Sequence, residues 1–177
     1  MLKPGIFGEG VSFEGMPYSY FLIELLNEFN NRFQAAADAF FKEISWKQCF
    51  LLTCITFFKE PPVIKQLAEL TGCSHQNTKQ LLIKLEKGGY VRLLQDKADK
   101  RKQRVVLTEQ AREFQKENDK ESAELMTQLF SGVNASELKT TMETIIKLHV
   151  NLKAIEEKKI VIADQQKQTK EAANETK

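Results

Sequence analysis

The sequence is poor in the side chains that most often bind metals or act as nucleophiles. Among its 177 residues are two histidines, His75 and His149, and three cysteines, Cys49, Cys54 and Cys73. The cysteines form no CxxC pair, and an odd number in a chain of this length favours reduced, buried thiols over a disulfide framework. A zinc site would need an unusual ligand set. We therefore predict that the protein holds no metal ion and needs no cofactor.

Motifs typical of enzymes and membrane proteins are also missing. The chain has no GxSxG motif and no glycine-rich loop that could cradle a phosphate group, so we expect no catalytic residue. Its longest nearly apolar run, Cys49–Phe58, is ten residues long and contains two threonines, whereas a helix that crosses a bilayer needs ~20 apolar residues. The first ten residues, MLKPGIFGEG, lack the apolar core of a secretory signal. These absences predict a cytoplasmic protein with no membrane partner.

Composition and length indicate one folded domain. Hydrophobic residues make up 42% of the 177 residues and charged residues 28%, both close to ordinary globular values. Glycines and prolines crowd residues 1–17, which predicts a flexible extension. Apolar residues recur at helical spacing over 18–58 and 109–158, which predicts long helices there. Helices within these ranges are expected to start at caps formed by Ser45, by Thr108, and by Asn134 with Glu137. We expect a single domain over 18–158, followed by a polar tail over 159–177 that is disordered or loosely helical at its end.

The formal net charge of +2 hides an uneven distribution. Between Pro61 and Thr108 the chain has ten basic and four acidic residues, a net charge of +6, whereas the remainder has sixteen basic and twenty acidic residues, a net charge of −4. Positive charge concentrated in one segment is what binding to a polyanion requires. A solvated charged surface would give the same pattern, so the charge needs a fold to interpret it.

The basic segment has the pattern of a helix-turn-helix followed by a β-hairpin. A short helix over Val63–Leu70 ends at Thr71 and Gly72, and a second helix capped by Ser74 runs to Lys87. Gly88 and Gly89 supply the left-handed conformation after it. Strand-like runs over Tyr90–Gln95 and Gln103–Leu107 then flank the charged tip DKADKRK. This order predicts a winged helix-turn-helix over 61–108.

The second helix of this unit has a polar side suited to reading bases. On a helical wheel Thr78, Leu81, Leu82 and Leu85 share the inner side, and the three leucines are expected to fill a shared core with Leu67 and Leu70 of the first helix. Glutamine and asparagine can pair with adenine in the major groove, and lysine can reach guanine or a phosphate. The predicted DNA-binding residues of this helix and its cap are Ser74, His75, Gln76, Asn77, Lys79, Gln80 and Lys84. An ordinary hydrated helix face would have the same polarity, and His75 alone is typical of a surface histidine.

The hairpin carries the more specific motif, D-x-R-x-x-x-V-x-L-T, which begins at Asp99 and ends at Thr108. An arginine at such a tip can enter a narrow minor groove, and Asp99 would hold the Arg101 guanidinium in position. The hairpin residues that we predict to bind DNA are Lys97, Lys100, Arg101, Lys102 and Arg104. A plain surface ion pair between Asp99 and Arg101 is the alternative.

Together with the block LAELTGCSHQNTKQLLIKLEKGGYV, this motif resembles the MarR family of bacterial transcriptional regulators, over about residues 18 to 157. The resemblance implies a mainly α fold, a winged helix-turn-helix with a small β-hairpin wing and long N- and C-terminal dimerisation helices. It also implies a homodimer that binds a palindromic operator in double-stranded DNA, most often as a repressor. A small hydrophobic or phenolic effector between the dimerisation helices and the DNA-binding lobe would release the operator. The alternatives are a winged-helix dimer that binds another protein, and a thiol-based redox sensor.

Overall fold

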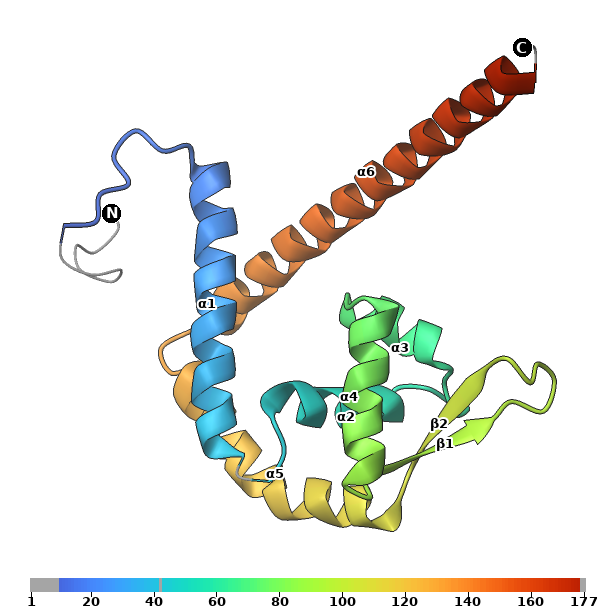
Figure 1. Cartoon of the computed structure of the whole chain (residues 1–177). Helices are drawn as coiled ribbons and strands as arrows, with labels where there is room; N and C mark the ends of the chain where they lie inside the picture. Colours follow the sequence, from blue (N-terminus) through green and yellow to red (C-terminus); the bar gives the residue numbers. More distant parts are fainter. Residues whose placement is uncertain (1–9, 42, 176–177) are drawn as a thin grey trace. The chain divides into compact units, whose positions relative to one another are not determined.

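The computed structural model describes residues 10–41 and 43–175, and their side chains as far as residue 159 (Figure 1). Contacts between residues divide the chain into two units, Met1–Asn118 and Asp119–Lys177. Part of the predicted extension, residues 1–9, lies outside the described residues, as do residues 176 and 177 of the predicted tail. The domain limits expected from the sequence stay a prediction.

The first unit is mainly helical and carries one antiparallel hairpin, as predicted. Its elements are α1 (Tyr18–Phe40), α2 (Trp46–Thr56), α3 (Ile64–Thr71), α4 (His75–Lys87), β1 (Val91–Gln95), β2 (Gln103–Leu107) and the first part of α5 (Glu109–Leu129). In the hairpin Val91 pairs with Leu107 and Gln95 with Gln103. Helix α4 leads directly into this hairpin (Figure 1). The order of a helix-turn-helix and a wing is therefore confirmed.

Side chains cap the helices where the sequence predicts. The Ser45 hydroxyl accepts a hydrogen bond from the Gln48 N–H at the start of α2, and Gln48 Oε1 accepts the Ser45 N–H at 3.0 Å. Thr108 Oγ1 accepts the Ala111 N–H at 3.2 Å at the start of α5. After α4, only Gly89 is left-handed, with φ of 83°, whereas Gly88 has φ of −77°. Of the two glycines expected to supply the left-handed conformation, Gly89 does so and Gly88 does not.

The core of the first unit lies where α2, α3, α4 and the hairpin meet. Leu67, Leu82 and Leu85 are fully buried, as predicted. Leu70, expected in the same core, is 47% exposed. At 100° per residue Leu70 lies more than a quarter turn from the centre of the buried side of α3, which Ile64, Leu67 and Ala68 form.

The three cysteines are free, but they are not equally buried. Cys54 is buried, whereas Cys49 and Cys73 are only half-buried. The expectation of buried thiols is therefore confirmed for Cys54 alone. Burial raises the pKa of the Cys49 and Cys54 thiols, which lowers the fraction of reactive thiolate.

The second unit contains the rest of α5 and the long helix α6 (Ala135–Glu175). Asn134 and Glu137 form the predicted capping box, with the Glu137 N–H donating to Asn134 Oδ1 at 3.0 Å. The helix continues through residues 159–175, which belong to the predicted polar tail. Glutamine, lysine, glutamate and alanine are good helix formers, and they sustain a helix without an apolar side.

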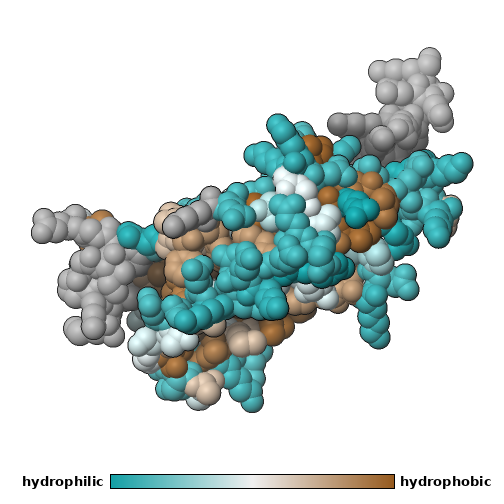
Figure 2. All heavy atoms as spheres, turned by 90° about the horizontal axis from the view of Figure 1, so that it is seen from below, coloured by the Kyte–Doolittle hydropathy of each residue, from teal (hydrophilic) through white to brown (hydrophobic). Residues whose placement is uncertain are grey.

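Apolar side chains are exposed on α1 of the first unit and on α6 of the second unit. Hydrophobic residues appear as brown patches on the surface in Figure 2. On α6 the exposed apolar side chains are Leu138, Met142, Ile146, Leu148, Val150, Leu152 and Ile155. On α1 they are Tyr18, Tyr20, Ile23, Leu26 and Phe29. No helix within the described residues has a stretch apolar enough to serve as a membrane span.

Candidate nucleic-acid interface

Helix α4 has one side in the core and the other in solvent. Thr78 is buried, and its hydroxyl donates to the Ser74 carbonyl at 3.1 Å, which satisfies the polar group inside the core. We call the exposed side of α4 the reading face, and it consists of Gln76, Asn77, Lys79, Gln80 and Lys84. Ser74 Oγ caps the helix by accepting the Asn77 N–H at 3.2 Å. The structure thus brings the residues predicted on this helix to one exposed surface.

The reading face carries positive charge without a competing carboxylate. Lys79 and Lys84 form no ion pair with any residue that the structure describes. The one acidic residue of α4, Glu86, accepts the Leu93 N–H of β1 at 2.8 Å and so lies against the hairpin. The amide and ammonium groups of this face are therefore available to an external ligand.

The hairpin tip holds an arginine away from the protein. Arg101 donates to Asp99 from Nε at 3.1 Å and from Nη2 at 3.4 Å, yet its side chain is 91% exposed. These hydrogen bonds from Arg101 are the main reason why the pKa of the Asp99 carboxyl lies below its usual value. Lys102 Nζ approaches the same carboxylate at 3.4 Å. The ionised carboxylate orients a guanidinium whose outer side remains open.

A second aspartate, which sequence reasoning missed, forms hydrogen bonds with the backbone of the hairpin tip. The Asp96 carboxylate is only 5% exposed and accepts the N–H groups of Ala98 and Asp99, both at 2.8 Å. Hydrogen bonds from the Asp99 N–H, the Arg104 side chain and the Ala98 N–H lower the pKa of Asp96. An aspartate that binds N–H groups two and three residues ahead is typical of turns, and the spacing in DKAD was a signal for it.

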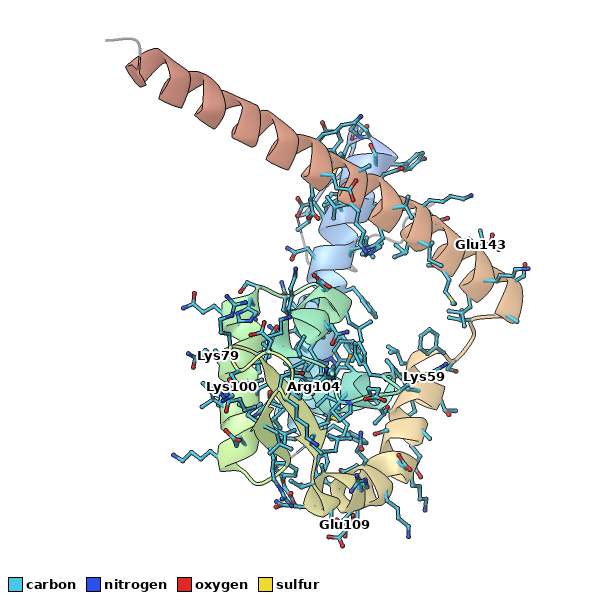
Figure 3. All side chains as sticks on the ribbon, turned by 90° about the vertical axis from the view of Figure 1, so that its right-hand side faces the viewer. Lys59, Lys79, Lys100, Arg104, Glu109 and Glu143 are labelled. Carbon is cyan, nitrogen blue, oxygen red and sulfur yellow. The ribbon has the colours of Figure 1, made fainter. Side chains whose placement is uncertain are left out.

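Arg104, which the sequence predicts to bind DNA, also forms hydrogen bonds within the protein. Its guanidinium is bound to the Asp96 carboxylate and donates to the Pro61 carbonyl at 2.7 Å. These bonds fasten the hairpin, close to its tip, to the segment that precedes α3, so Arg104 supports the wing. Lys97 and Lys100 are exposed and form no ion pair with a described residue. In Figure 3 Lys79 and Lys100 extend outward from α4 and the hairpin tip.

No protein-family model matches the sequence, and no curated protein matches it. Solved structures do match. A MarR protein from Peptoclostridium difficile is 20% identical, with a TM-score of 0.71 over 82% of this chain and 94% of that chain. A MarR transcriptional regulator from Methanosarcina mazei is 21% identical, with a TM-score of 0.66 over 76% of this chain and 98% of that chain. MepR of Staphylococcus aureus, solved as a complex with DNA, is 18% identical, with a TM-score of 0.68 over 77% of this chain and 99% of that chain.

The fold is that of the MarR transcriptional regulators. This confirms the fold that the wing motif and the helix-turn-helix block predict. In this MarR fold the reading face of α4 and the tip of the hairpin wing carry most of the predicted DNA-binding residues.

The first unit also contains a pocket of about 400 Å³, which is lined in part by α4. Its lining comes from α1, α2, the end of α3, the turn after it and α4: Asn30, Phe33, Gln34, Trp46, Lys47, Phe50, Leu51, Thr71, Cys73, Thr78 and Leu81. Phe33 meets the Trp46 ring edge-on at a centroid distance of 4.8 Å, and Trp46 stacks with Phe50 at 6.2 Å. An aromatic wall with a few amide and ammonium groups suits a small aromatic ligand that carries a polar group.

Nothing in the described residues forms a metal centre. No group of three histidine, cysteine, aspartate or glutamate side chains gathers within the residues that the structure describes.

Proposed function

We propose that the protein is a homodimeric, sequence-specific DNA-binding transcriptional regulator without catalytic activity, and a repressor of a palindromic operator. The observation that carries this proposal is the wing tip. An ionised Asp99 orients an arginine that is 91% exposed, next to a helix face of amides and unpaired lysines. MepR, which has the same fold, was solved with DNA. Binding of DNA by this surface would explain why positive charge is concentrated in residues 61–108.

Different side chains would serve affinity and sequence reading. Gln76 and Gln80 lie one turn apart on the reading face, so both can enter a major groove, where amides pair with adenine. Arg101 would enter the neighbouring minor groove, whose negative potential rises where A·T base pairs make it narrow. Lys97 and Lys100, exposed on the wing, would contact phosphates and fix the orientation of the helix.

A partner subunit would cover the exposed apolar side chains of α1 and α6. Obligate homodimers bury large apolar surfaces between their subunits. Leu152 and Ile155 on α6 are each more than half exposed, as is Ile23 on α1. Sedimentation at micromolar concentration should give a species of twice the chain mass. A stable monomer at that concentration would rule out the dimer and, with it, a palindromic site read by two equal heads.

Binding to a random-sequence DNA duplex across a salt series tests the DNA-binding proposal. Each phosphate contact releases counterions, so log affinity should fall linearly with log salt, by about 0.9 for each contact. A protein that used the same basic surface to bind an acidic protein would show no measurable DNA binding in this series. That result would favour the interaction module over the regulator.

The aromatic pocket is the proposed effector site. A phenol would stack on Trp46 and Phe50 and place its hydroxyl near the amide groups of Asn30 and Gln34, which also line the pocket. It can release DNA only if it binds more tightly to the arrangement that does not fit the operator.

Trp46 is the single tryptophan of the chain, so its fluorescence reports directly on the pocket. Titration with phenol should quench the emission, and Phe50→Ala should reduce the quenching. Unchanged emission up to millimolar phenol would remove phenolic compounds as effectors and leave the DNA-binding proposal intact.

A further inference from the structure

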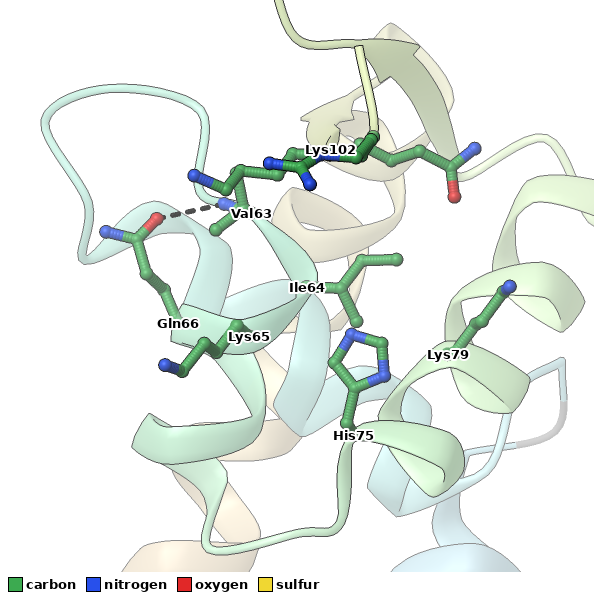
Figure 4. A pocket seen from close by; sticks show the side chains of 9 residues that line it. Val63, Ile64, Lys65, Gln66, His75, Lys79 and Lys102 are labelled. Atoms are coloured by element: carbon green, nitrogen blue, oxygen red, sulfur yellow. Dashed lines mark hydrogen bonds between the residues drawn. The ribbon is translucent and has the colours of Figure 1, made fainter. Parts of the chain in front are cut away.

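A second hollow, of about 430 Å³, lies between α3, α4 and the wing (Figure 4). Its lining residues are Val63, Ile64, Lys65, Gln66, His75, Lys79, Arg101, Lys102 and Gln103. We call it the basic cleft. Four of these side chains are permanent cations, one is a histidine and none is a carboxylate. A surface hollow with this lining attracts an anion.

His75 lines the basic cleft from the start of α4. In Figure 4 its ring lies between Ile64 of α3 and Lys79 of α4, with Lys102 of the wing on the opposite side. Because His75 and Lys79 are four residues apart on α4, they share one side of that helix. His75 is exposed, so an anion in the cleft can reach its ring nitrogens.

The charged groups around His75 leave the cleft positive. On α3, Lys65 has one carboxylate neighbour, Glu69, at 3.8 Å. On the wing, Arg101 and Lys102 share the single carboxylate of Asp99. These pairs are exposed or partly exposed, so solvent weakens them and they compete little with an external anion.

Helix geometry adds donors from the backbone. The first turn of the eight-residue helix α3 lines the cleft, and its Val63 N–H is already bound by Gln66 Oε1 at 2.9 Å. The remaining N–H groups at the start of a helix have no acceptor within the helix and carry partial positive charge. The start of α3 therefore favours a negatively charged ligand, as the lysines do.

We propose that the basic cleft is the seat of one backbone phosphate of bound DNA and that His75 takes up a proton when this phosphate binds. The inference rests on the proposed function, because α4 and the wing are the elements placed on DNA there. It assigns two residues a phosphate contact at one defined place: Lys65, which the sequence did not single out, and His75, which was more typical of a plain surface residue.

Proton uptake has a measurable consequence. Histidine changes its charge between about pH 5 and pH 8, whereas a phosphodiester and the lysines of the cleft keep theirs. An imidazolium adds one charge and a second N–H donor toward the phosphate, so DNA affinity should rise as the pH falls. The steepest possible slope is about tenfold per pH unit for each histidine, because one proton is taken up at each cleft.

The experiment measures fluorescence anisotropy of a labelled random-sequence duplex at constant ionic strength between about pH 5.5 and pH 8. Variants are His75→Asn, which removes the titrating group, and His75→Lys, which keeps a permanent charge. The matched control is His149→Asn, since His149 is the only other histidine and is exposed on α6. Trp46 emission of each variant shows whether the fold is kept.

We expect the wild type and His149→Asn to bind more tightly as the pH falls. The DNA affinity of His75→Asn should not change with pH and should stay near the weak wild-type affinity at high pH. The affinity of His75→Lys should not change with pH either, and should stay near the tight wild-type affinity at low pH. At pH 5.5 the salt slope of His75→Asn should be shallower by ~0.9 per protomer. If DNA binds with normal salt dependence but His75→Asn keeps the wild-type pH profile, the cleft inference is wrong and the proposed function stands. If no duplex binds at any pH, both are wrong.

Discussion

Replacing Arg101 by alanine should weaken DNA binding without disturbing the fold. The side chain is 91% exposed, and its described hydrogen bonds go to Asp99 alone. In a dimer the substitution removes two cations, one from each wing. If each contacts one phosphate, the slope of log affinity against log salt should become shallower by about 1.8. Extrapolated from equal affinities at 1 M salt, this slope change gives about a 60-fold loss at 0.1 M.

The assay is anisotropy of a labelled duplex across a salt series, with Arg112→Ala as the matched control. Arg112 is also an exposed arginine with a near carboxylate partner, Glu109 at 2.9 Å, but it lies on α5. Figure 3 shows Glu109 well away from Lys79 and Lys100 within the first unit. The control should keep the wild-type slope. Equal slopes for Arg101→Ala and the wild type would remove the wing arginine from DNA binding.

Four further substitutions test base reading, the hairpin tip and the packing of α4. Gln76→Ala or Gln80→Ala should cost about 1–3 kcal/mol on a selected operator and almost nothing on random duplex; equal losses on both would show that neither glutamine reads bases. The pKa of Asp96 is lowered by folding, so its stabilising effect is complete above pH ~4 and is lost as the pH falls through the folded-state value. Asp96→Asn should therefore lower stability to urea at pH 7 and lower it by less as the pH is decreased, and an equal loss at every pH would contradict this. Leu82→Ala, at a fully buried position in α4, should cost about 2–5 kcal/mol in urea unfolding, and a loss below about 1 kcal/mol would mean that α4 is not packed as described.

The sequence predicted those parts of the fold that depend on neighbouring residues. The caps at Ser45, Ser74 and Thr108 depend on contacts three residues apart, and the structure contains each of them. Gly72 ends α3 in the left-handed conformation for a reason equally local. The buried side of α4 followed from helical periodicity, and so did the exposure of its reading face.

Longer-range contacts could not be read from the sequence. The sequence showed Arg104 as one cation among several in a basic tip, and only the hairpin register brings it to Asp96 and to the Pro61 carbonyl. Glu86 similarly lies against the Leu93 N–H because α4 and β1 turn back on each other. Helix α6 continues through the predicted polar tail as far as Glu175, because glutamine, lysine, glutamate and alanine favour a helix.

Sequence-specific DNA binding is the central claim, and selection of genomic fragments by the full chain tests it most directly. Fragments that the protein retains would be sequenced, and the affinity for one of them would be compared with that for a random duplex at the same salt concentration. Retained fragments should share an inverted repeat and bind at least ~10³-fold more tightly than random duplex. Retained fragments without a common sequence, bound no more tightly than random duplex, would contradict it.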